Sequence, residues 1–127
     1  MSYYFSKKLN MGFDEAIEKV TSALKSEGFG ILTEIDVKET LKKKLDVDFR
    51  PYKILGACNP PFAHKALEAE DKIGMMLPCN VIVQQLDDGV EIAAVDPVAS
   101  MQAVENDKLS EIASTIQKKL KSVIEGL

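Results

Sequence analysis

Two thiols and an imidazole are the side chains of this sequence whose types could do chemistry together. Cys58 lies in a CNP segment, Cys79 lies in a PCN segment, and His64, the single histidine, stands between them. Thiolate and imidazole are ligands that soft metals prefer, and two neighbouring thiols can also exchange between dithiol and disulfide. The candidate ligand-binding residues are therefore Cys58, Asn59, His64, Cys79 and Asn80, and the candidates for a metal are Cys58, Cys79 and His64.

The spacing of these residues is not that of a common metal or catalytic motif. Five residues separate Cys58 from His64 and fourteen separate His64 from Cys79, whereas a closed zinc site needs four ligands at finger-like spacings. One histidine without a nucleophile motif does not predict a triad, and the scattered glycines form no phosphate-binding loop. His64 falls off the apolar side of its helix, one turn from Glu68, which favours an exposed, paired histidine. No catalytic residue or cofactor is identified.

The segment Tyr52–Pro61, YKILGACNPP, predicts a strand that is followed directly by a helix. A helix N-terminus can bind an anion and lower the pKa of a nearby thiol. Pro60 and Pro61 remove two of the amides that a phosphate would use, so a structural cap by Asn59 is favoured. If the strand near Cys79 runs antiparallel to Tyr52–Ala57, Cys79 is expected beside Cys58; a parallel pairing would separate the two thiols.

The elements that position these residues follow an α+β order. Alternation and turn residues predict strands, helical periodicity and capping residues predict helices, and Asp87-Asp88-Gly89 predicts a hairpin turn. Asp36 with Glu39 resembles a capping box, and Asp96 with Pro97 predicts a short helical turn. The predicted strands are Tyr3–Leu9, Phe29–Ile35, Tyr52–Ala57, Val81–Leu86 and Val90–Val95; the predicted helices are Phe13 to a stop at Gly28, Val37–Leu45, one after Asn59, and Asp107–Glu125.

These elements predict a single α+β domain over residues 1–127, with two layers, a mostly antiparallel sheet and a long C-terminal amphipathic helix. Helices on one face of the sheet would leave the other face uncovered. The strands carry apolar residues on both faces, as Ile54 with Leu55 and Ile92 with Ala93 show. A large apolar face is rarely exposed on a monomer, so a homodimer is expected.

The composition of the chain limits the classes of partner that it is expected to bind. The 127 residues carry a net charge of −4, and Arg50 is the only arginine, which argues against a nucleic-acid partner. The sequence has neither a signal-peptide pattern nor an apolar run of about 20 residues, so no membrane association is expected. Two cysteines indicate free thiols in the cytoplasm rather than a disulfide framework.

Four segments, GFGILTEIDV, DFRPYKILGACNPPFAHKAL, GMMLPCNVIVQQLDDG and VDP, resemble the domain-of-unknown-function 302 family over nearly the whole chain. The CNP and PCN pair is the most specific part of this resemblance. The resemblance implies a compact α+β domain of TATA-binding-protein-like architecture, a fold group that includes helix-grip proteins with an apolar cavity. It carries no established catalytic residues onto this sequence.

The leading functional hypothesis is a non-enzymatic, dimeric binding module with a small-ligand pocket near the CNP and PCN segments, where irregular polar segments gather at strand ends. An alternative is a thiol-based redox or soft-metal protein that uses Cys58 and Cys79, aided by His64. A third hypothesis is a structural or interaction domain in which these segments only fix turns.

Overall fold

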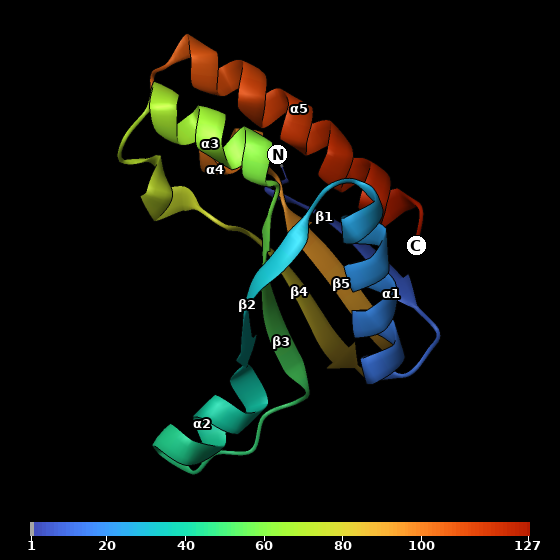
Figure 1. Cartoon of the computed structure of the whole chain (residues 1–127). Helices are drawn as coiled ribbons and strands as arrows, with labels where there is room; N and C mark the ends of the chain where they lie inside the picture. Colours follow the sequence, from blue (N-terminus) through green and yellow to red (C-terminus); the bar gives the residue numbers. More distant parts are fainter. Residues whose placement is uncertain (1) are drawn as a thin grey trace.

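The computed structural model describes residues 2–127 and contains one five-stranded antiparallel sheet in the order β1-β5-β4-β3-β2. Helices interleave with the strands (Figure 1). The elements are β1 (Tyr4–Leu9), α1 (Phe13–Ser26), β2 (Gly30–Asp36), α2 (Val37–Leu45), β3 (Tyr52–Cys58), α3 (Pro60–Ala69), the 3-10 turn η1 (Ile73–Met76), β4 (Cys79–Leu86), β5 (Gly89–Val95), α4 (Pro97–Ser100) and α5 (Asp107–Glu125).

The core lies between the sheet and the helices α1 and α5, which cover one of its faces (Figure 1). Burial alternates along β4 and β5, as a strand with one covered face requires. The buried strand residues are Leu55, Ala57, Cys79, Val81, Val83, Val90, Ile92 and Ala94, and they pack with Ala16, Val20, Leu24, Ile116, Leu120, Val123 and Ile124 of the helices. The predicted two-layer α+β architecture, with its long C-terminal helix, is confirmed.

Local signals in the sequence account for several element ends. The Asp36 carboxylate accepts a 2.9 Å hydrogen bond from the Glu39 N–H at the start of α2, and the Asp96 carboxylate accepts one of 2.9 Å from the Val98 N–H at the start of α4. Both predicted caps are confirmed. The end of α5 is held by a contact from β1, because the Lys7 ammonium donates to the carbonyls of Glu125 and Leu127.

The second strand differs from its prediction. Strict alternation over the predicted range would place Phe29, Ile31, Thr33 and Ile35 on one face, but a register shift between Ile31 and Thr33 breaks the alternation. Ile31 therefore packs against the core, whereas Ile35 lies opposite Ile54 and is 48% exposed. An irregularity of this kind depends on pairing with β3, so the alternating sequence of β2 does not reveal it.

Helix α2 lies at the end of the sheet away from α3 and α5 (Figure 1). It has no buried residue, and its main contacts are with β2 and β3, the strands that it connects. We call residues 32–49 the arm. The arm presents exposed apolar side chains at Leu32, Ile35, Leu45 and Val47.

Candidate functional site

The CNP and PCN segments lie side by side in the fold. Strands β3 and β4 pair antiparallel, with Ala57 opposite Cys79 and Gly56 opposite Asn80. The antiparallel alternative therefore holds, and Cys79 is the neighbour of the residue that precedes Cys58. Side chains alternate between the two faces along a strand. Cys79 and Ala57 therefore face the helices, whereas the Cys58 side chain points to the opposite face of the sheet.

Both thiols are free, and their environments favour the protonated form. Cys79 is buried in the core, and burial, with a smaller contribution from the nearby Cys58, raises the pKa of its thiol from 9.0 to about 11. Cys58 is half-buried, and burial raises the pKa of its thiol as well. Reactive cysteines show the opposite shift, because the thiolate is the nucleophile and the metal ligand.

Asn59 has a structural contact other than the one that its position predicts. Its side chain does not cap α3, so that prediction is wrong. The side chain is instead buried, and its Nδ2 donates to the carbonyl of Glu27 at 3.2 Å. Glu27 caps the end of α1 and precedes Gly28, whose φ is +88°. Asn59 thus ties the α1–β2 turn to the start of α3.

Substitution of Asn59 tests this tie. Asn59→Ala removes the hydrogen bond, and the Glu27 carbonyl loses this donor. We therefore expect the free energy of unfolding to fall by about 1–2 kcal/mol. Urea denaturation monitored by circular dichroism measures it. Asn80→Ala, an exposed asparagine of the same pair of motifs, is the control and should change stability by less than about 0.5 kcal/mol. Equal effects of the two variants would contradict the assignment.

The remaining candidates lie apart from one another. The His64 side chain is 75% exposed, and its Nε2 lies 3.4 Å from Glu68 Oε1, as the helical spacing predicts. Asn80 is exposed on the face of the sheet opposite to Cys79. Asn59 and Cys79 share a small apolar cavity of about 30 Å³ beneath α3, α4 and α5, which Cys58, His64 and Asn80 do not line. Within residues 2–127, no three His, Cys, Asp or Glu side chains form a group able to hold a metal ion.

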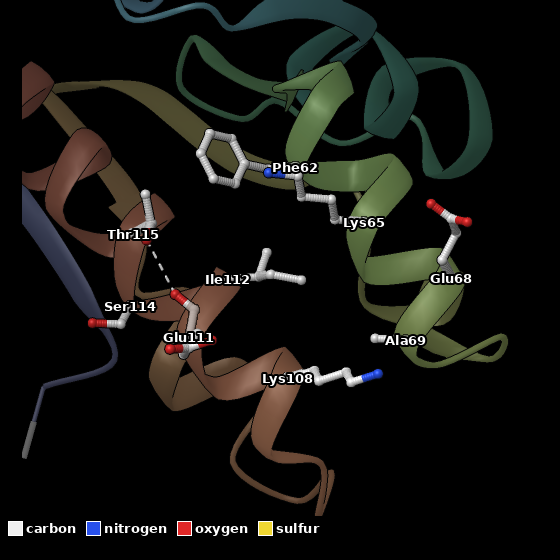
Figure 2. Close-up of a pocket in the computed structure, with 9 residues that line it drawn as sticks. All are labelled: Phe62, Lys65, Glu68, Ala69, Lys108, Glu111, Ile112, Ser114 and Thr115. Atoms are coloured by element: carbon white, nitrogen blue, oxygen red, sulfur yellow. Dashed lines mark hydrogen bonds between the residues drawn. The ribbon is translucent and has the colours of Figure 1, made fainter.

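An open groove of about 750 Å³ lies between α3 and α5, where the sequence patterns do not indicate a site. Figure 2 shows the side chains that line it: Phe62, Lys65, Glu68, Ala69, Lys108, Glu111, Ile112, Ser114 and Thr115. Two lysines and two glutamates balance its charge, and all four lie exposed. The Thr115 hydroxyl is bonded within α5, to the carbonyl of Glu111 at 3.1 Å. The groove therefore lacks a buried polar group that would orient a ligand.

The face of the sheet turned away from α1 and α5, which we call the open face, holds a second hollow of about 400 Å³. Its lining residues come from β1 and the residue before it, and from β3, β4 and β5: Tyr3, Tyr4, Tyr52, Asn80, Ile82, Gln84, Glu91, Ala93, Ala94 and Val95. They include all three tyrosines of the chain, which has no tryptophan. Asn80 is the one residue of the predicted set that lines it.

The floor of this hollow is apolar, and one edge is a polar network. Ile82 pairs with Ala93 at the centre. Along the edge, the Arg50 Nε donates to Gln84 Oε1 at 2.9 Å, and Gln84 Nε2 donates to Glu91 Oε1 at 2.8 Å. The Arg50 guanidinium also lies 5.6 Å from the centre of the Tyr52 ring. Alternation in β4, which places Asn80, Ile82 and Gln84 on one face, is the sequence signal that could have indicated this surface.

The fold and this surface define a small α+β protein with one helix-covered sheet face and one open, hollowed face. The sequence matches the model of "Domain of unknown function DUF302" over residues 5–127, so the chain belongs to this family. The structure is similar to the crystal structure of an uncharacterized conserved DUF302 protein from Bacillus stearothermophilus, with 32% identity, a TM-score of 0.91 and coverage of 98% of both chains. No curated protein matches the sequence. In the part of the chain that the structure describes, no helix is both long and apolar enough to cross a membrane.

Proposed function

We propose that this protein is a non-catalytic binding module whose ligand site is the hollow on the open face. The observation that carries the proposal is a hollow of about 400 Å³ that joins an apolar floor to polar groups. Ligand sites typically span about 300–1,000 Å³ and combine apolar lining with a few polar groups. Ile82 and Ala93 supply the floor, while Asn80, Gln84 and Glu91 supply hydrogen-bonding groups. The ligand class that fits is a small, partly apolar molecule with hydrogen-bonding groups.

The sequence predicts a pocket near Cys58 and Cys79, whereas the proposed site lies on the open face of the sheet. The PCN segment contributes Asn80 to this site. Thiol or soft-metal chemistry through Cys58 and Cys79 has weaker support, since burial raises the pKa of both thiols. The free thiols fit the reducing cytoplasm that the sequence predicts. We also propose that the protein is a homodimer, because its helices leave one sheet face uncovered.

Tyrosine fluorescence provides a direct test, because every tyrosine of the chain lines the hollow and no tryptophan masks the signal. The probe is N-phenyl-1-naphthylamine, a neutral and largely apolar dye with one N–H group. We expect saturable dye binding to the folded protein, with quenching of the tyrosine emission. Ile82→Asn should weaken dye binding about tenfold, since it replaces an apolar floor residue with an amide.

The matched control is Leu67→Asn, which changes a leucine that is 44% exposed on α3, outside the hollow. Leu67→Asn should leave dye affinity unchanged. Circular dichroism of each variant establishes that it is folded. Dye binding that fails to saturate, or that is equally weakened by the two substitutions, would contradict the proposed site.

A further inference from the structure

We propose that a second copy of this chain packs on the open face, with the arm as part of the contact, and thereby closes the hollow. The inference rests on the proposed role of the open face as the binding surface, and it identifies what supplies the outer wall of the ligand site. Three observations support it: an apolar row across the sheet, an excess of accessible surface, and an arm whose helix α2 has no buried residue.

The apolar row runs through four neighbouring strands. Ile35 pairs with Ile54, Ile54 pairs with Ile82, and Ile82 pairs with Ala93. Directly paired residues of antiparallel strands share a face, so the four side chains form one line across the open face. Buried strand residues such as Leu55 and Val81 lie on the helix-covered face and form the core. The apolar row lies on the other face and is separate from this core.

Polar side chains border this row. On one side lies a second cross-strand line, in which Tyr52 pairs with Gln84, Gln84 with Glu91, and Glu91 with Lys8. On the other side, Asn80 lies opposite Gly56. An apolar centre with a polar rim is the usual composition of an interface between proteins.

The accessible surface of the chain is larger than its mass requires. A folded monomer of 14.0 kDa is expected to expose about 6,700 Å². This chain exposes 7714 Å², an excess of about 1,000 Å². Each partner in a stable complex of standard size buries about 800 Å². The excess is thus comparable to the area that one protomer contributes to a dimer.

The arm contributes to this excess and is continuous with the apolar row. Ile35 begins the row. Leu45, which is 67% exposed, ends α2, and Val47, which is 43% exposed, follows it. Isolated helices shorter than about 12–15 residues are marginal in water, and α2 has nine residues without a buried side chain. A partner surface that covers Leu45 and Val47 would stabilise this helix. A second copy with two-fold symmetry presents the same apolar row to the arm.

Sedimentation velocity of the full chain from low to high micromolar concentration tests the dimer. We expect a reversible dimer of the wild type, accompanied by protection of the tyrosines from acrylamide quenching as the dimer forms. Ile82→Glu places a charge at the centre of the row and should weaken association by about tenfold or more. The double substitution Leu45→Ser with Val47→Ser should also weaken it, whereas the exposed α3 substitution Leu67→Ser should not.

A wild type that remains monomeric at high micromolar concentration would overturn the inference. So would a dimer that withstands both Ile82→Glu and the arm substitutions, since it would then use another surface. The measurements on the wild type do not depend on whether a variant folds. Monomers that bind the dye would refute the dimer alone, and dimers that do not bind it would refute the ligand site alone.

Discussion

Gly56→Ala is expected to lower the free energy of unfolding by about 2–3 kcal/mol, because overpacking a well-packed site forces neighbouring atoms to move. Gly56 is buried in the central part of β3. An added Cβ would lie 2.1 Å from Thr33 Oγ1 and 2.8 Å from Pro78 Cγ. Thr33 lies in β2 and Pro78 precedes β4, so relief requires the Thr33 side chain to rotate away from β3 and the Pro78 ring to shift at the entry to β4. Urea denaturation monitored by circular dichroism measures the loss.

A double-mutant cycle identifies the cause. Thr33→Ala removes the hydroxyl that lies nearest to the added Cβ, so it should restore part of the stability lost in Gly56→Ala, and the two effects should not be additive. The Pro78 contact remains, so restoration should be incomplete. Gly30→Ala is the matched control in β2, since its added Cβ would meet nothing within 4 Å. Additive effects of the Gly56 and Thr33 substitutions would contradict this account.

Alkaline pH is expected to destabilise the protein through Cys79. Its thiol has a pKa raised from 9.0 to about 11 by burial, so the unfolded chain loses this proton before the folded protein does. Stability from this group is therefore complete below pH 9 and declines as the pH rises towards 11. A difference of about two pKa units corresponds to a loss of about 3 kcal/mol at most.

The Cys79 contribution is measured as a difference between two proteins, because lysines and tyrosines also titrate above pH 9. Denaturation of the wild type and of Cys79→Ala is compared from pH 7 to pH 11. The variant should be less stable at neutral pH, since a buried side chain is shortened, but its stability should decline less steeply with pH. Cys58→Ala, at the half-buried thiol, is the control and should have a smaller effect on the slope. Parallel curves for the wild type and Cys79→Ala would refute the prediction.

Much of the candidate site could not be predicted from residue types alone. Rare residue types and prolines meet in the CNP and PCN segments, and this composition predicts a site there. Those segments do lie side by side, but Cys79 and Asn80 face opposite sides of β4, and His64 points to solvent. The residue types do not indicate the hollow that the three tyrosines line, because Tyr3 and Tyr4 are far from Tyr52 in sequence. Only the pairing of β1, β5, β4 and β3 places them around one hollow.

The sequence by itself determined several features of this protein. These are the family, the α+β class, the bounds of α2 and α5, and the caps at Asp36 and Asp96. These features depend on side-chain periodicity and on contacts within a few residues, which the order of the residues specifies. The shift in β2, the partner of Asn59 and the hollow on the open face were decided by the tertiary structure. Each depends on which strands pair and in what register, and those contacts join residues that are distant along the chain.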